Sequence, residues 1–123
     1  IRRVLELVSA NPALLAPGST FTQSVVTQAA TDIGSVITRL YAGGARHVLL
    51  LNSSNLGLHP AVPSTAKPLA TGLATAYNGA LAAQVIPGLK ASSPGLNIYY
   101  ADVGKLSNDV VADPASFGIT KPE

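Results

Sequence analysis

Cysteine, methionine and tryptophan are absent from this sequence of 123 residues. Without cysteine, the chain can form neither a disulfide nor a thiolate metal site. Aromatic residues are also scarce, with 4 Tyr and 2 Phe. A core built mostly from Ala, Val, Leu and Ile favours helices layered against a sheet over a large aromatic cluster.

Charged residues are equally sparse. They make up 11% of the chain, the net charge is +2, and Arg2-Arg3 is the one basic run, with no aromatic residues interleaved. This pattern does not support nucleic-acid binding. No apolar run approaches the ~20 residues that span a bilayer, so no membrane span is expected in this segment. At 47% hydrophobic, the chain is too apolar for a disordered segment, and its length fits one domain at most.

Helical and strand patterns alternate along the chain. Apolar residues at three- and four-residue steps predict helices, whereas short continuous apolar runs predict strands buried between helices. The expected helices cover residues 1–10, 19–42, 66–86 and 104–112, and the expected strands lie near 47–52 and 96–101.

Several residues are expected to start or end these elements. Gly43-Gly44 should end the second helix. Thr65 should cap the third, with Pro68 in its first turn, and Pro87-Gly88 should end or kink it. The tail that follows Pro114 is expected to be irregular.

Strands separated by helices imply a parallel sheet with right-handed crossovers. The run Val48–Leu51 is therefore expected to be almost wholly buried. Two strands alone leave both sheet edges open and apolar helix faces uncovered. The sequence is interpreted as part of an α/β domain from which some of the sheet is missing.

Three blocks of this sequence resemble, in the same order and spacing, blocks of the GDSL (SGNH) esterase and lipase family, and the helix-rich start of the chain resembles its autotransporter and lipase-like branch. They are "GARHVLLLNSSNLGLHPAV", "AYNGALAAQV" and "GLNIYYADVGKLSNDVVADPASFGI". All three lie within about residues 29–119. The resemblance implies a three-layer, flavodoxin-like fold and hydrolysis of carboxylic esters by a serine nucleophile. It implies no cofactor, and a secreted or cell-surface bacterial location.

The signature motifs of that family, Gly-Asp-Ser, Gly-x-Asn-Asp and Asp-x-x-His, do not occur here. The resemblance therefore implies that residues 1–123 are the central and later part of a single SGNH-like domain. On this interpretation no catalytic residue lies in the chain. The nucleophilic Ser, the oxyanion Gly and Asn and the Asp-His pair would lie on the remaining polypeptide of the same domain, and the substrate would be a small ester or lipid.

The loop after the first strand contains two serines and a histidine. A serine nucleophile needs a base about 3 Å away and oxyanion donors beyond it. Ser54 lacks the Gly-x-Ser-x-Gly elbow, and no neighbouring carboxylate could orient His59, so Ser53 and Ser54 are interpreted as loop residues. Loops at the carboxyl ends of parallel strands line ligand crevices. The residues expected to bind substrate are therefore Asn55, Leu56, Leu58 and His59.

Other polar residues have structural interpretations. Asp102 is expected to cap the helix that follows it. Asn78 is expected to bond to backbone, and His47 to begin a strand. Asp109 and Asp113 do not have metal-ligand spacing with any His, so no metal site is expected.

Three functions stay open at the level of the sequence. An ester hydrolase that acts on short-chain esters is the first. A non-catalytic α/β binding or structural module of the same fold is the second. A nucleotide-binding domain is a distant third, because no Gly-x-Gly-x-x-Gly loop follows either strand.

Overall fold

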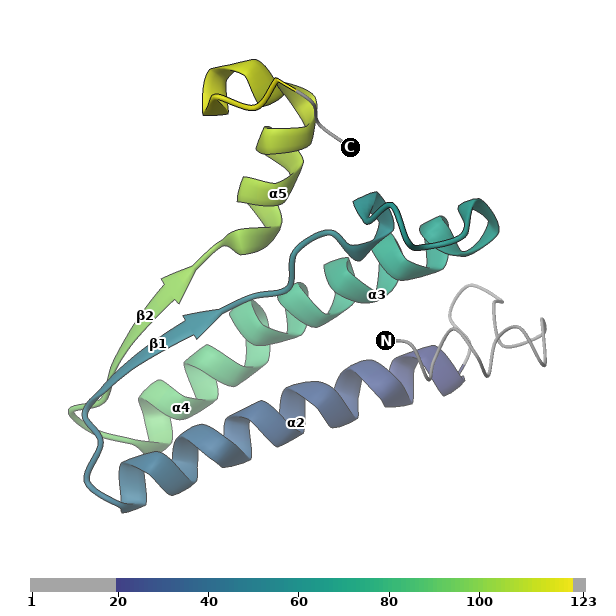
Figure 1. Ribbon diagram of the computed structural model, residues 1–123. Helices are drawn as coiled ribbons and strands as arrows, with labels where there is room; N and C mark the ends of the chain where they lie inside the picture. The colour runs from purple at the N-terminus through teal and green to yellow at the C-terminus, as the bar shows by residue number, and fades with distance from the viewer. Residues whose placement is uncertain (1–19, 121–123) are drawn as a thin grey trace.

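The structure is a computed structural model that describes residues 20–120, and most of it is helical. The helix expected over residues 1–10 lies outside the described residues. α2 lies beside α3, and the β1–β2 pair lies over this helix layer (Figure 1). The segments η2, η3 and η5 are 3-10 turns, and η4 is a π-helical segment. In chain order the elements are α2 (Thr20–Ala42), β1 (His47–Leu51), η2 (Leu56–Leu58), η3 (Ser64–Ala66), α3 (Lys67–Ala80), η4 (Leu81–Val85), α4 (Ile86–Ser92), β2 (Asn97–Ala101), α5 (Val103–Ala112) and η5 (Pro114–Phe117).

α2 ends where the sequence predicts. Gly44 has a φ of +108°, which glycine adopts at little cost. The N–H groups of Gly44 and Ala45 donate to the carbonyls of Tyr41 and Leu40, both at 3.0 Å. These bonds satisfy carbonyl groups that the last helical turn leaves free. The predicted second helix and its end are confirmed.

β1 and β2 pair in parallel, as the sequence predicts. The register places Val48 opposite Ile98 and Leu50 opposite Tyr100. The connection between the strands runs through α3, η4 and α4. The described part of the chain is therefore an α/β unit with a two-stranded parallel sheet, mostly helical by content.

The core lies between the sheet and the helix layer. Ile37, Leu50, Leu89 and Leu96 form its buried cluster, with Val48 and other partly buried residues packed against it. On the opposite face of the sheet, Leu49 and Leu51 are 65% and 52% exposed. The expectation that Val48–Leu51 is almost wholly buried is therefore wrong. The reason is that helices of the described residues cover one sheet face, whereas such strands are buried when both are covered.

The helical segment between the strands is longer than expected. Pro87 lies in the first turn of α4. The π-helical segment η4 precedes it, and the Ile86 N–H bonds to the Leu81 carbonyl with the wider π spacing. Helical structure thus continues to Ser92, and the prediction that Pro87-Gly88 ends or kinks the helix is wrong on the position of the end.

The beginning of this helix also differs from the prediction. Ala66, not Thr65, is the residue before α3, and no side chain caps it, since the 3-10 turn η3 leads directly into the helix. Pro68 does lie in the first turn. The predicted position of this helix start is confirmed, and the prediction that Thr65 caps it is wrong.

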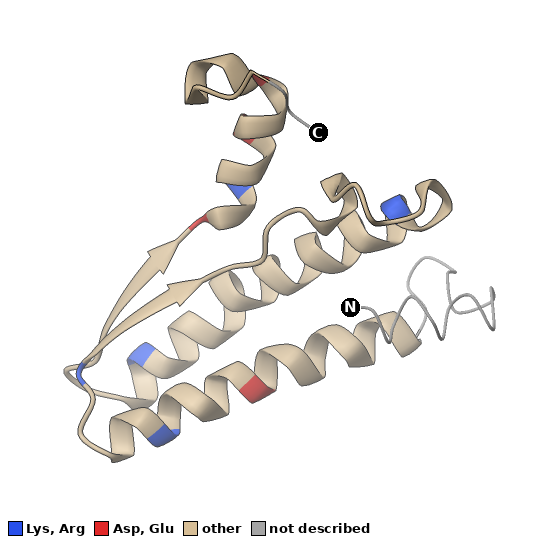
Figure 2. Cartoon of the chain, viewed as in Figure 1, with Lys and Arg blue, Asp and Glu red and all other residues tan. Residues whose placement is uncertain are grey.

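α5 leaves the carboxyl end of β2 and projects away from α2 (Figure 1). The tail after it contains most of the 3-10 turn η5, so the expectation of an irregular tail is wrong for residues 115–117. Gly118, with a φ of +76°, closes that turn. Charged residues are scattered over the ribbon and do not gather on one face of the described chain (Figure 2).

Candidate functional site

The carboxyl ends of β1 and β2 meet at a network around the buried side chain of Asn52. The Asn52 amide nitrogen donates to the Tyr100 hydroxyl and to the Asp102 carboxylate, both at 2.9 Å. Its amide oxygen accepts from the Gly104 N–H at 2.9 Å. One buried amide thus fixes the end of β1, the end of β2 and the start of α5 relative to one another.

Asn78 of α3 holds the loop that leaves β1. Its amide oxygen accepts from the Ser53 N–H and its amide nitrogen donates to the Ser53 carbonyl, both at 2.8 Å. The expectation that Asn78 bonds to backbone is confirmed. This pairing satisfies two main-chain groups just beyond the sheet, where the ladder no longer does so.

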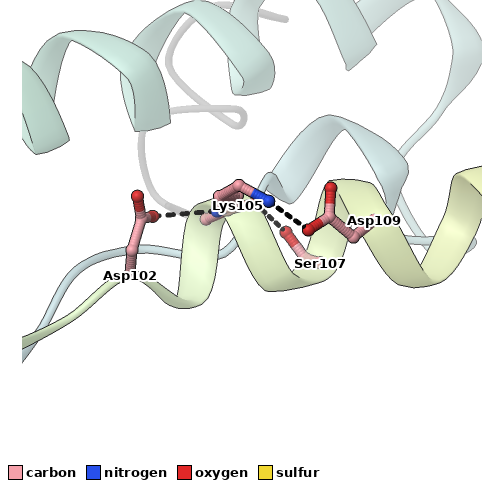
Figure 3. A network of polar contacts seen from close by, with 5 residues as sticks. Asp102, Lys105, Ser107 and Asp109 are labelled. Atoms are coloured by element: carbon pink, nitrogen blue, oxygen red, sulfur yellow. Dashed lines mark hydrogen bonds and ion pairs between the residues drawn. The ribbon is translucent and has the colours of Figure 1, made fainter. Parts of the chain in front are cut away.

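Asp102 caps α5, as predicted. Its carboxylate accepts from the Lys105 N–H at 2.9 Å (Figure 3). This bond, followed by the bond from Asn52, lowers the pKa of Asp102. Lys105 in turn contacts Asp109 one turn further on, and this partner raises the pKa of Lys105.

The Asn55 side chain is hydrogen-bonded to other residues of the chain. Its amide oxygen accepts from the Gly57 N–H and the Thr71 hydroxyl at 3.1 and 2.9 Å. Its amide nitrogen donates to Asn108 of α5 at 3.0 Å. Asn55 therefore ties the loop to α3 and α5, and both of its amide groups are occupied.

Leu58 and His59 lie further from this network, at the end of η2. Both are exposed. The His59 Nδ1 accepts from the Ala61 N–H at 3.2 Å, a contact within its own turn. Among the described residues no carboxylate bonds to His59. The ring is oriented by the loop and not by an acid.

Ser53 and Ser54 do not form a nucleophile–base pair. The Ser53 hydroxyl donates to the Ser54 carbonyl at 2.9 Å. No histidine in the described ranges bonds to either hydroxyl. The interpretation of both as loop residues agrees with these contacts.

An apolar pocket of 220 Å³ lies beside the loop, between α2 and α3. Its only polar contributions come from Ser53 and Tyr77. Burial and then the nearby Tyr100 raise the pKa of Tyr77, so its hydroxyl stays protonated at neutral pH. The full lining is Val25, Val26, Ala29, Ser53, Leu56, Leu73, Ala74 and Tyr77.

Of the four residues expected to bind substrate, the structure places Leu56 in this pocket. The sequence did not predict the pocket-lining residues of α2 and α3, because their pattern is that of ordinary core positions in amphipathic helices. Tyr77 carried the clearest signal, as an aromatic residue with a polar tip on a helix face otherwise made of Ala and Leu.

A second, larger groove of 1470 Å³ runs along α2 and the α3–α4 segment. Its lining is rich in small residues and includes Ala30, Gly34, Gly72 and Gly79. Val26 and Leu73 line both the groove and the pocket.

The outer sheet face carries an aromatic contact. His47 stacks on Tyr99, with ring centroids 6.2 Å apart, and its Nδ1 lies 3.3 Å from the Tyr99 hydroxyl. His47 begins β1, as expected. Within residues 20–120, no cluster of His, Asp or Glu could hold a metal ion. None of the helices described has the length and apolar character to cross a membrane.

No protein-family model matches the chain, and no curated protein matches it.

Proposed function

We propose that this chain supplies the scaffold and part of the pocket wall of a serine ester hydrolase of the GDSL type. The nucleophile, oxyanion donors and base would lie on the remaining polypeptide of the same domain. The fold would then be the three-layer, flavodoxin-like sheet of that family, of which β1 and β2 are two neighbouring strands.

One observation carries the proposal: an apolar pocket lies beside the loop at the carboxyl end of a parallel strand pair. Open parallel sheets bind ligands outside the carboxyl ends of their strands. The three blocks that resemble GDSL esterases also fall on this unit in order. The first covers β1 and its loop, the second α3 and η4, and the third β2, α5 and η5.

The uncovered outer face of the sheet supports the proposal that further polypeptide completes the domain. Leu49, Leu51 and Tyr99 expose more than half of their surface on the outer face, which bears no charged side chain. Sheets of parallel strands are normally covered on both faces. A further helix and further strands of the same domain would bury these side chains and pair the open edge of β1.

The residues of this chain would act by positioning and by excluding water. Asn52 and Asn78 hold the loop Ser53–Leu56 at a fixed place relative to both strands. A fixed pocket wall keeps the ester group in one orientation beside a nucleophile carried elsewhere. Bond breaking would need a serine, a base and oxyanion donors converging on one carbonyl carbon.

The test is hydrolysis of p-nitrophenyl acetate and butyrate. The full-length protein is expected to hydrolyse both, and a protein of residues 1–123 is expected to hydrolyse neither. Ser54→Ala in the full-length protein should keep most of kcat. His59→Ala should likewise keep most of kcat, because the exposed ring lies outside the pocket lining and bonds to no carboxylate within residues 20–120.

Two results would overturn the proposal in different ways. A drop in kcat of a thousandfold or more for either variant would place catalysis in this loop. Failure of the full-length protein to turn over any ester would instead favour a non-catalytic binding module of the same fold.

A further inference from the structure

The 1470 Å³ groove runs between α2 and the α3–α4 segment, and none of its described lining residues lies on β1 or β2. We infer that residues 1–10 form an amphipathic helix that packs in the end of this groove nearest Thr20. The inference goes beyond the proposed function, because it concerns what covers the helix layer and not which ester is cleaved.

The lining of the groove has the composition of a surface that another segment covers. Of its 22 described lining residues, Arg39 is the only charged one, and 13 are Val, Leu, Ala, Gly or Pro. At the end nearest Thr20 the lining includes Val26 and Leu69, which are half-buried, and Gly72, which is exposed. A contiguous apolar surface of this kind usually marks an interaction site.

Residues 1–10 lie within reach of this end of the groove. α2 and the α3–α4 segment lie side by side and run in the same direction, so both begin at the same end (Figure 1). The chain enters α2 there, at Thr20. The nine residues 11–19 span about 30 Å when fully extended, and α2, with 23 residues, is about 35 Å long. The connection therefore allows residues 1–10 to lie along α2.

The sequence of this segment has the pattern that such a groove accepts. At about 100° per residue, one stripe of a helix carries the apolar residues Ile1, Val4, Leu5 and Val8. The opposite side carries the charged residues Arg2, Arg3 and Glu6. Packing antiparallel to α2, which a short connection favours, places Leu5 level with Val26. Val26 and Leu73 line a common pocket, so Gly72, the neighbour of Leu73, lies at the same level.

The first test uses two glycines from opposite ends of the groove. Gly72 and Gly88 are both exposed helix positions in its lining, and a Cβ on either meets no described atom within 4 Å. In an open groove, Gly72→Leu and Gly88→Leu should both raise the melting temperature of the full-length protein, because leucine favours a helix more than glycine does. With residues 1–10 in place, Gly72→Leu is expected to lower the melting temperature by about 3 °C or more, whereas Gly88→Leu still raises it.

A second pair of variants separates loss of docking from simple misfolding. Leu5→Asp puts a charge on the apolar stripe, whereas the control Arg3→Asp puts the same residue on the charged side. Leu5→Asp is expected to lower the melting temperature, and Arg3→Asp to leave it nearly unchanged. In the Leu5→Asp protein, Gly72→Leu should cost nothing further, because a vacated groove accepts the added side chain.

Crosslinking measures the proximity directly, since residues 1–123 contain no cysteine. In the full-length protein, Leu5→Cys is combined with Gly72→Cys or, as a control, with Gly88→Cys. The two glycines lie about 24 Å apart along the helical segment, at 1.5 Å per residue. A short bismaleimide is expected to join positions 5 and 72 and not positions 5 and 88, and mass spectrometry of the peptides identifies the joined pair.

Three results would overturn the inference. A rise in melting temperature for Gly72→Leu equal to that for Gly88→Leu would show that the groove is open. Absence of the crosslink between positions 5 and 72 in the folded protein would place residues 1–10 elsewhere. Loss of a dimer in Gly72→Leu, followed by sedimentation velocity, would assign the groove to a second copy of the chain. None of these measurements uses ester turnover, so each is independent of the proposed function.

Discussion

Position 104 requires glycine because three segments approach one another there. A Cβ on Gly104 would lie 2.8 Å from the Asn78 amide nitrogen and 2.9 Å from the Ser53 carbonyl oxygen. Both atoms belong to the pairing that holds the loop, so neither can move without losing hydrogen bonds. The glycine thus allows α5 to begin directly against α3 and the end of β1.

Gly104→Ala is expected to destabilise the full-length protein by about 1–3 kcal/mol, the usual cost of an overpacked site. Gly79→Ala is the matched control, because a Cβ there meets no atom within 4 Å. Removing a glycine from a helix interior should stabilise by about 0.5–1 kcal/mol. Urea unfolding of both variants gives the comparison. A neutral Gly104→Ala variant would contradict the packing described at the start of α5.

Some of these residue roles could be predicted and others could not. Asp102 precedes a helical pattern, and an aspartate at such a position predicts a cap from local spacing alone. Asn52 carries no comparable signal, because its partners Tyr100, Asp102 and Gly104 are about fifty positions away. Contacts of this range depend on the parallel register, which the sequence does not specify.

At the scale of the element, the first turn of α5 depends on an ionised carboxylate. The pKa of Asp102 is lowered by the bond from the Lys105 N–H and then by the bond from Asn52. A carboxylate with a lowered pKa in the folded state stabilises that state above its unfolded pKa of about 3.9. This contribution is lost as the pH falls through the lower, folded value.

Asp102→Asn keeps an oxygen that can accept the capping bond but removes the titration. The variant is therefore expected to lose less stability than the unchanged protein between about pH 5 and pH 2. Asp113→Asn is the control, since the Asp113 side chain makes no hydrogen bond within residues 20–120. Melting temperature measured against pH for the three proteins is the readout. Parallel acid profiles for Asp102→Asn and the unchanged protein would show that the cap is not ionic.

The local sequence pattern predicted the positions of the helices and strands, but it predicted their ends less accurately. Apolar periodicity located α2, α3 and both strands, since each depends on residues a few positions apart. Pro87 misled the prediction because proline in a helix pattern usually marks a break. The π-helical segment before it, which allows a helix to continue, depends on packing that the sequence pattern does not express.

At the scale of the whole molecule, the outer sheet face distinguishes the chain alone from a complete domain. Leu49 is 65% exposed and lies beside Tyr99, which is 55% exposed, in the register of the sheet. If the remaining polypeptide of the domain packs on this face, Leu49 is buried in the full-length protein. If it does not, a charge at this position meets water and costs little.

Leu49→Lys is therefore expected to destabilise the full-length protein by at least ~2 kcal/mol, from lost apolar burial and an unpaired charge. Lys90→Leu, at an exposed position of α4, is a surface control and should change stability by less than ~0.5 kcal/mol. A protein of residues 1–123 is expected to unfold without a cooperative transition, because its two-stranded sheet leaves apolar side chains of the outer face exposed. Calorimetry of the full-length protein, its two variants and residues 1–123 tests both expectations. A sharp transition in monomeric residues 1–123, together with a neutral Leu49→Lys variant, would show that no further polypeptide covers this face, and the proposed division of the hydrolase domain would then be wrong.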